Sequence, residues 1–315
     1  MLHQRMHLPG KLAVLTTHFN SVGYERTRNN YKVFAENVKR QGADLWAVEI
    51  VFGNDNFFLP KNEKTIQIQT SDILWQKEAA LNVLIKNLPK EYDKIVWVDA
   101  DLIFNNNNWL SETASKLEEY PVVQCFETLL SLSQEGNNYS RVKTSIGFAV
   151  KNSLPCFSNL FYYQPGCAWA GRREIFEKYE LYSGHITGGG DSLMTIAFCK
   201  WKKHHYIRNN MGESMAIHFN KWANRIYPVV RGNISYVSGS INHLWHGEYA
   251  NRMYDQRIQI LKDNDFDPEV DIAIGSNGLL QWATDKPVLH HEVKKYFWNR
   301  QEEGISNTPE LVHTT

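Results

Sequence analysis

The segment KIVWVDADLIF, residues 94–104, is the most informative part of the sequence for predicting the fold, because it joins a buried strand to a pair of carboxylates. Four consecutive apolar residues, Ile95 to Val98, precede the acidic segment, and Leu102 to Phe104 follow it. A short apolar run of this kind is typical of a strand that is buried on both faces of a parallel sheet. We therefore predict a buried strand over residues 94–104, interrupted by the acidic segment.

Strand and helix patterns alternate on the N-terminal side of this stretch. Buried or half-buried strands are predicted at residues 11–16, 43–52 and 65–70, and helices at 30–41 and 72–88. This alternation predicts an α/β fold with a mostly parallel central sheet and right-handed crossovers. The second half is more mixed, with strands predicted at 121–129, 145–150 and 231–247 and helices at 172–181, 190–202, 248–262 and 290–302.

Composition narrows the class of protein. Hydrophobic residues make up 43% of the 315 residues and charged residues 22%, which is ordinary globular usage. The 34 basic residues balance the 34 acidic ones, whereas a duplex-binding protein usually carries a basic excess. The four cysteines form no CxxC pair, so neither a zinc site nor a disulfide framework is indicated.

Cellular location is predicted from apolar runs. No run reaches the roughly 18 residues that a transmembrane helix requires. The apolar stretch at residues 11–16 is too short for a signal peptide and is better explained as a strand. We therefore expect a cytoplasmic enzyme without a transmembrane segment, and the sequence leaves its oligomeric state open.

Asp99 and Asp101 are the strongest candidates for a metal site. Residues i and i+2 of an extended segment point to the same side, and two carboxylates there repel each other unless a cation lies between them. Carboxylate ligands suit Mg²⁺ or Mn²⁺, which can also bridge a diphosphate, and open α/β sheets bind ligands at the carboxyl ends of their strands. The alternative is a surface turn with two solvated acids.

The segment HLWHG, residues 243–247, contains a second candidate group. One of His243 and His246 could supply a neutral imidazole to a metal, and the other could donate to a phosphate oxygen. Two surface histidines, or one that caps the following helix, would explain the pattern equally well.

A third segment, GGGDS, spans Gly188 to Ser192. Its glycines, including Gly189 and Gly190, would allow the backbone to approach a ligand closely. Asp191 could then be the general base that takes a proton from an acceptor hydroxyl. Because Asp is also a favoured N-cap residue, the residues alone leave both roles open.

The loop after the first strand, residues 16–30, should face the same crevice as the acidic segment. Thr16, His18 and Asn20 could bind a base or a ribose, and Arg28 or Arg26 could pair with phosphate. Neither a GxGxxG motif nor a GxxxxGK[ST] motif is present, which disfavours a dinucleotide-binding site and excludes a P-loop.

Two further segments have structural as well as functional explanations. Trp169, in GCAWAGRR, could form the floor of a sugar pocket, with Arg172 or Arg173 nearby, or could equally be a core residue. The basic run KWKKHH, residues 200–205, is best explained as a solvated helix end, and the alternative is a contact for a polyanionic acceptor.

Taken in order, these segments resemble the GT-A glycosyltransferases over residues 11–260. The resemblance is greatest to inverting members of the galactosyltransferase-like and polypeptide N-acetylgalactosaminyltransferase-like groups. LWQKE, GGGDSLM, HLWHGEYANRMYDQR and SNGLLQWATDKPVLHHEVKKYF also resemble uncharacterised bacterial, phage and large-virus proteins grouped with glycosyltransferases. The resemblance implies a GT-A-type, Rossmann-like α/β fold with a C-terminal helical and loop extension.

The resemblance also implies a role for each candidate residue. Asp101 would be the direct metal ligand and Asp99 would contact the sugar or ribose as well as the metal site. His243 would complete the metal shell, which leaves His246 for phosphate. The GGGDS turn would carry the base, Asp191, although it has one acid where these families have two or more.

We therefore expect a metal-dependent glycosyltransferase, of the hexosyltransferase type, that uses Mn²⁺ or Mg²⁺ and a nucleotide-diphosphate sugar, with UDP as the expected nucleotide. The expected acceptor is a glycan or lipid-linked saccharide, and the alternative is a hydroxylated modified base of phage DNA. A nucleotidyltransferase or nucleotide-sugar pyrophosphorylase, and a non-catalytic sugar-binding protein, are the competing classes. The expected division is a catalytic domain at 1–247, with a nucleotide-sugar half at 1–120 and an acceptor half at 121–247, followed by an extension at 248–315.

Overall fold

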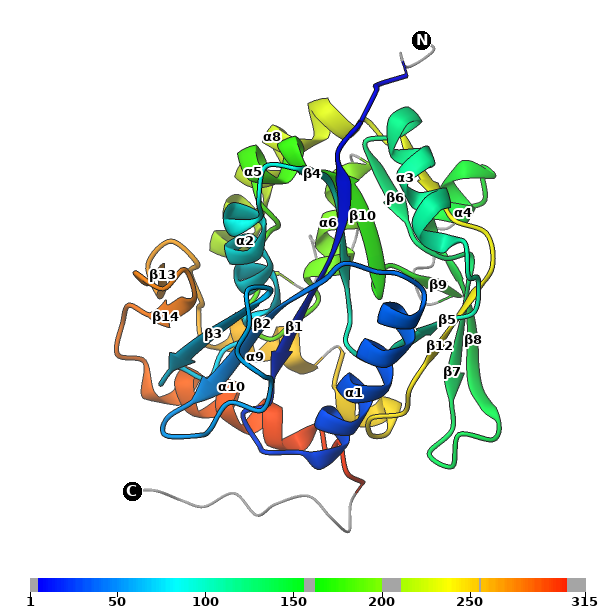
Figure 1. The fold of residues 1–315 in the computed structure, drawn as a ribbon. Coiled ribbons are helices and arrows are strands. Elements are labelled where there is room, and N and C mark those ends of the chain that lie inside the picture. The colour runs from blue at the N-terminus through cyan, green and yellow to red at the C-terminus, as the bar shows by residue number, and fades with distance from the viewer. Residues whose placement is uncertain (1–4, 156–161, 200–210, 255, 305–315) are drawn as a thin grey trace.

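The computed structural model describes residues 5–155, 162–199, 211–254 and 256–304. Over these residues, a seven-stranded sheet with strand order β11-β6-β10-β4-β1-β2-β3 forms the centre of the molecule (Figure 1). Neighbouring strands are parallel except at β10, which is antiparallel to β4 and β6. The strands are β1 (Lys11–Phe19), β2 (Leu45–Phe52), β3 (Thr65–Thr70), β4 (Tyr92–Val98), β6 (Val122–Gln124), β10 (Ala168–Arg172) and β11 (Ile234–Tyr236).

Helices flank both faces of this sheet, which confirms the predicted α/β class (Figure 1). Successive residues of a strand point to opposite faces, so Ile95 and Trp97 of β4 join one hydrophobic cluster and Val96 and Val98 join the other. The first cluster includes α2 (Lys77–Asn87), α5 (Arg173–Tyr179), α6 (Gly190–Phe198) and α8 (Glu213–Val230). The second includes α1 (Glu25–Arg40) and α3 (Trp109–Glu119).

The predicted strand at 94–104 is two strands in two different sheets. Strand β4 ends at Val98, residues 100 and 101 form a turn, and β5 (Leu102–Phe104) belongs to a second sheet of order β5-β12-β7-β8-β9. The turn separates Asp99 and Asp101, so the predicted extended geometry across them is wrong. The other strands of the second sheet are β7 (Thr128–Leu132), β8 (Tyr139–Ser145), β9 (Tyr163–Gln164) and β12 (Ser240–His243).

Two further predicted elements are wrong in type or extent, and two helices were not predicted. Residues predicted as a strand at 145–150 form helix α4 (Ile146–Lys151), because the Ser145 hydroxyl accepts the Phe148 N–H as an N-cap. The helix predicted at 248–262 is divided into η2 (Tyr249–Arg252) and α9 (Gln256–Asp263), since Met253 adopts a left-handed φ of 49°. The sequence analysis predicted neither α3 nor α8.

The C-terminal part contains η2, α9, the hairpin of β13 (Ile272–Ile274) and β14 (Leu280–Trp282), and α10 (Pro287–Asn299). Buried residues of α9, this hairpin and α10 belong to the same hydrophobic cluster as β1 and β4. Across the described residues, no helix has both the length and the apolarity needed to span a membrane.

Gly171 of β10 provides the first testable prediction. A Cβ atom at this position would overlap the ring of Phe176, which packs directly against the strand. We expect Gly171→Ala to lower the free energy of unfolding by about 1–3 kcal/mol in urea denaturation, because the ring has to shift within a packed core.

A double-mutant cycle provides the control. If the overlap is the cause, Gly171→Ala combined with Phe176→Leu should cost less than the sum of the two single changes. Strictly additive losses would contradict this explanation.

Candidate active site

A cavity of about 670 Å³ lies at the carboxyl ends of the central parallel strands. Its wall includes the end of β1, the acidic segment after β4, the start of α6 and the histidine segment at 243–247. Open α/β sheets bind ligands at this edge of the sheet. The structure therefore brings together, around one cavity, all three motifs with candidate metal-binding and catalytic residues.

Strand pairing explains how the histidines reach the acidic segment. In the antiparallel ladder between β12 and β5, His243 lies opposite Leu102. Immediately after the ladder, the Leu244 N–H donates to the Asp101 carbonyl oxygen at 2.8 Å. The two motifs are far apart in the sequence and are adjacent only because the second sheet joins them.

Asp101, His243 and His246 form a compact group of possible metal ligands, with one ligand atom of each lying within 4.8 Å of the others. Asp101 Oδ2 is 3.0 Å from His246 Nε2 and 3.5 Å from His243 Nε2, and the two ring nitrogens are 3.2 Å apart. Among the described residues, Asp101 Oδ1 is buried without a hydrogen-bond partner. One carboxylate and two imidazoles are ligands that fit a divalent cation such as Mn²⁺.

The protonation states of this group favour metal binding. Burial tends to raise the pKa of Asp101, but the neighbouring His243 and His246 outweigh burial and hold this pKa well below its usual value. Burial lowers the pKa of His243, although Asp101 acts in the opposite direction. A carboxylate and a neutral imidazole are the forms that coordinate a cation.

Asp99 lies outside this group of three and pairs with Lys77 instead. Lys77 Nζ is 2.5 Å from Asp99 Oδ1 and 3.0 Å from Asp191 Oδ2. Burial alone lowers the pKa of Lys77, but Asp191 and Asp99 outweigh it and raise that pKa well above the usual value. The buried ammonium group therefore neutralises charge on two carboxylates that face the same cavity.

Replacing Lys77 by methionine should leave these two carboxylates uncompensated. We expect Lys77→Met to lower the free energy of unfolding by about 3–5 kcal/mol at neutral pH, in urea denaturation without divalent cations. Lys86→Met is the matched control, because Lys86 lies on the same helix in an exposed pair with Glu180 and should cost about 0–1 kcal/mol.

The loss should also become smaller as the pH falls. Burial already raises the pKa of Asp99 to about 6, and removal of the ammonium group raises it further. The folded variant then binds more protons than the unfolded chain, so its stability increases on acidification. Similar small losses in both lysine variants would contradict the buried-charge explanation.

Asp191 lies at the start of α6 and points one oxygen toward Lys77. Its other oxygen, Oδ1, has no hydrogen-bond partner within the described part of the chain. The backbone conformation just before α6 favours glycine, since Gly188 and Gly189 have positive φ angles of 81° and 101°. Gly189 lines the cavity, whereas Gly190 is buried against Glu78, where a Cβ atom would overlap the carboxylate.

His18 and Asn20, the residues predicted to contact a base or a ribose, line the cavity. Burial, with a smaller effect of Arg28, lowers the pKa of His18 to about 4, so its imidazole is neutral. The Asn20 side chain accepts the Gly23 and Tyr24 N–H groups at 3.1 and 2.9 Å, which stabilises the loop before α1. Asn20 therefore shapes the cavity wall whether or not it contacts a ligand.

Besides Gly190, three predicted residues do not line the cavity. Thr16 is fully buried and donates its hydroxyl to the Val98 carbonyl oxygen at 2.9 Å. Arg28 pairs with Glu25 on α1 at 3.2 Å. Trp169 is buried in the core, where its indole N–H donates to the Pro165 carbonyl oxygen, so a role as the floor of a sugar pocket does not fit.

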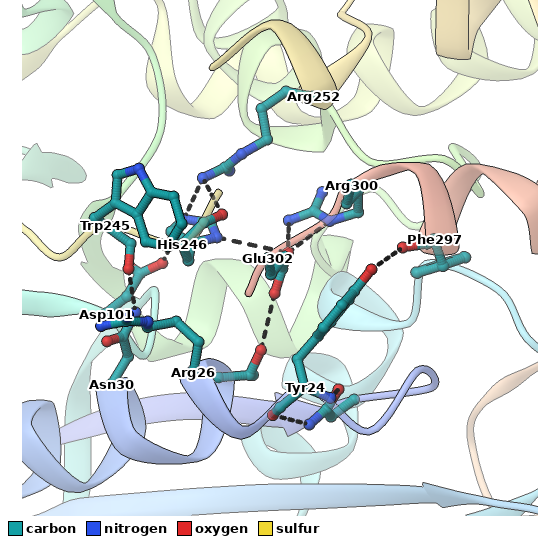
Figure 2. Close-up of polar contacts among 12 residues, drawn as sticks. Tyr24, Arg26, Asn30, Asp101, Trp245, His246, Arg252, Phe297, Arg300 and Glu302 are labelled. Atoms are coloured by element: carbon teal, nitrogen blue, oxygen red, sulfur yellow. Dashed lines mark hydrogen bonds and ion pairs between the residues drawn. The ribbon is translucent and has the colours of Figure 1, made fainter. Parts of the chain in front are cut away.

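Several cavity residues were not predicted from the sequence. One feature could have identified Lys77, which follows an apolar run and lies at the start of a largely buried helix. No feature of the sequence identified Glu302, which Figure 2 shows between Arg300 and His246. Arg252 also contacts His246, with Nη2 2.5 Å from Nε2. The basic run KWKKHH, at 200–205, lies outside the described residues.

Comparisons with known proteins give only distant matches. Neither a protein-family model nor a curated protein sequence matches the chain. The catalytic domain of Drosophila β1,4-galactosyltransferase 7, in complex with xylobiose, has a TM-score of 0.38 and 14% sequence identity, covering 92% of this chain and 98% of that chain. Mannosyl-3-phosphoglycerate synthase from Rubrobacter xylanophilus has a TM-score of 0.36 and 10% identity, covering 88% and 85%.

A nucleotidyltransferase-type enzyme is similar to the same extent. The 4-diphosphocytidyl-2C-methyl-D-erythritol synthase from Anaerococcus prevotii has a TM-score of 0.35 and 10% identity, covering 80% of this chain and 94% of that chain. Likenesses this distant do not distinguish transfer of a sugar from transfer of a nucleotide. The assignment of function therefore depends on the residues of the cavity.

Proposed function

We propose that the chain is a metal-dependent glycosyltransferase that transfers a sugar from a nucleotide-diphosphate donor to an acceptor hydroxyl. One observation carries this proposal, namely that the group Asp101–His243–His246 and the carboxylate of Asp191 face one cavity. In metal-dependent transfer with inversion, a cation neutralises charge on the diphosphate and a base takes the proton of the acceptor hydroxyl. The cavity contains residues suited to both tasks.

The proposed metal ligands are Asp101, His243 and His246, a set that differs from the one expected from the resemblance. A bound Mn²⁺ or Mg²⁺ would neutralise negative charge on the departing diphosphate, as a Lewis acid does. Asp99, which pairs with Lys77, would remain available for the ribose or the sugar.

Asp191 is the proposed general base. Its Oδ1 would take the proton of the acceptor hydroxyl, while Lys77 holds Oδ2 at 3.0 Å. The acceptor oxygen then forms a bond to the anomeric carbon as the bond from that carbon to the phosphate oxygen breaks. The nucleoside diphosphate departs with the bonding electrons, and a single displacement of this kind inverts the anomeric configuration.

The C-terminal extension, proposed to begin at residue 248, would help to exclude water. Phe297, Arg300 and Glu302 already line the cavity, although they lie about 200 positions after the acidic segment. Water exclusion matters because hydrolysis of the donor competes with transfer. The proposed boundary, 1–247 and 248–315, follows this difference in role.

The finer proposals concern substrates and location. We propose a UDP-hexose donor and a glycan or lipid-linked saccharide acceptor in the cytoplasm. The net charge of zero favours a saccharide over a modified base of DNA as the acceptor, because duplex binding depends on basic residues.

A donor screen tests the class of enzyme. The protein would be incubated with Mn²⁺ and a panel that includes UDP-galactose, UDP-glucose and UDP-N-acetylhexosamines, and released nucleoside diphosphate would be measured with and without EDTA. We expect EDTA-sensitive release from one donor. Pyrophosphate exchange into a nucleotide sugar, without diphosphate release, would assign the chain to the nucleotidyltransferases instead.

A further inference from the structure

Residues 297–304, here called the C-terminal strap, cross from the end of α10 to His246 and the start of α1 (Figure 2). The Tyr24 hydroxyl donates to the Trp298 carbonyl oxygen at 2.9 Å, and the Asn251 amide donates to Gln301 Oε1 at 3.1 Å. The Arg26 N–H donates to Glu303 Oε1 at 2.6 Å. The strap is therefore attached on both sides of the cavity.

The carboxylate of Glu302 is fixed within this strap. The side chain is 10% exposed, and it accepts from Arg300 Nε at 2.7 Å and from the Thr27 hydroxyl at 2.8 Å. Although burial acts in the opposite direction, Arg300 and His246 hold the pKa of Glu302 well below its usual range. Glu302 is therefore a carboxylate at neutral pH.

Two neighbours define the orientation of the His246 ring. Arg252 Nη2 is 2.5 Å from Nε2, and Glu302 Oε1 is 3.5 Å from Nδ1. A guanidinium group can only donate, so Nε2 must accept and carries no hydrogen. In a neutral ring the hydrogen then lies on Nδ1, which faces the carboxylate, so both contacts require the same tautomer.

Coordination of a cation by Nε2 needs this tautomer, because the nitrogen that binds a metal cannot carry a hydrogen. Nε2 also faces Asp101 Oδ2 at 3.0 Å and His243 Nε2 at 3.2 Å, the other members of the proposed metal group. Because a carboxylate can only accept, the Asp101 contact favours a hydrogen on Nε2 until a cation lies between the two groups. Histidine ligands usually donate their second ring N–H to a carboxylate or carbonyl, which fixes the tautomer and raises the basicity of the ligand. Arg252 and a cation would compete for the Nε2 lone pair.

We infer that Glu302 is a positioning residue that holds His246 with its hydrogen on Nδ1 and thereby presents Nε2 to a divalent cation. This inference rests on the proposed function, because only a bound cation removes the competing contact between Asp101 and Nε2. A residue of the C-terminal strap would then determine the metal affinity of a site whose ligands lie at 101, 243 and 246.

The tautomer can be measured by nitrogen-15 NMR of labelled histidine at neutral pH in the presence of saturating, diamagnetic Mg²⁺, with His246→Gln to assign the signal. We expect the wild-type ring to carry its hydrogen on Nδ1. In Glu302→Ala the population with hydrogen on Nε2 should increase. A wild-type ring with hydrogen on Nε2 would overturn the inference.

Metal affinity is measured separately, by titration of the protein with Mn²⁺ alone, followed by electron paramagnetic resonance. Glu302→Ala should bind Mn²⁺ about 10- to 100-fold more weakly, as is usual when an outer partner of a histidine ligand is lost. Glu302→Gln should stay within a few-fold of the wild type, because Arg300 would orient the amide oxygen toward His246.

Glu303→Ala is the matched control, since Glu303 also anchors the strap but contacts the Arg26 backbone instead of His246. We expect it to retain wild-type Mn²⁺ affinity. Equal losses in the Glu302 and Glu303 variants would assign the effect to the strap as a whole and overturn the inference. Wild-type protein that fails to bind Mn²⁺ would overturn the proposed function, whereas a Glu302→Ala variant that binds Mn²⁺ as tightly as the wild type would overturn this inference alone.

Discussion

Asp101→Ala should abolish both Mn²⁺ binding and Mn²⁺-dependent release of nucleoside diphosphate. The change removes the carboxylate that lies within 3.0 Å and 3.5 Å of the two imidazoles, leaving two neutral ligands. The loss of affinity should exceed the roughly 10- to 100-fold that loss of an outer partner costs. Titration with Mn²⁺ and the donor-release assay measure the two effects.

A matched control separates this effect from a general loss of negative charge. Asp263→Ala removes an exposed carboxylate on α9 that contacts Gln259, and it should change neither measurement. If Asp101→Ala binds Mn²⁺ as tightly as the wild type, the group Asp101–His243–His246 does not hold the metal. The central proposal would then be wrong.

Asp191→Asn should reduce kcat by about 10²- to 10⁴-fold, which is the usual contribution of a general base. Asparagine keeps the shape of the side chain but cannot take the proton of the acceptor hydroxyl. Mn²⁺ affinity should remain unchanged, because Asp191 is not one of the three grouped ligands. Steady-state kinetics with the identified donor and acceptor measures kcat.

The stereochemistry of the product tests the same step independently. Proton NMR of the anomeric signal should show inversion, since Asp191 acts on the acceptor in a single displacement. A kcat within a few-fold of the wild type, or a product with retained configuration, would contradict the assignment of Asp191 as the base. Mn²⁺ binding could persist in that case, so the metal site and the base are tested separately.

Local sequence pattern was sufficient to predict most of the central sheet. The apolar runs at β1, β2 and β4 are buried on both faces, so each needs only its own composition to be identified as a strand. The acidic segment follows β4, and the carboxyl edge of a parallel sheet is where such residues meet a ligand. The position of Asp101 on the cavity wall could therefore be predicted from sequence alone.

The contacts between distant segments could not be predicted in this way. Lys77 and Asp191 are separated by 114 positions, and the tail residue Glu302 reaches His246 only because the strap folds back over the cavity. Trp169 was ambiguous because an indole ring suits a core as well as a sugar, and only packing shows that it is buried.

Local patterns of apolar and polar residues are enough to specify the α/β class, the buried strands and the three motifs that line the cavity, because burial and turns leave such patterns along the chain. Only the folded chain shows how the two aspartates divide, with Asp99 toward Lys77 and Asp101 toward the histidines. This division follows from the turn between β4 and β5, which directs the chain into a second sheet. Pairing of β5 with β12 then sets the partners of Asp101, and such pairing depends on residues that local pattern cannot connect.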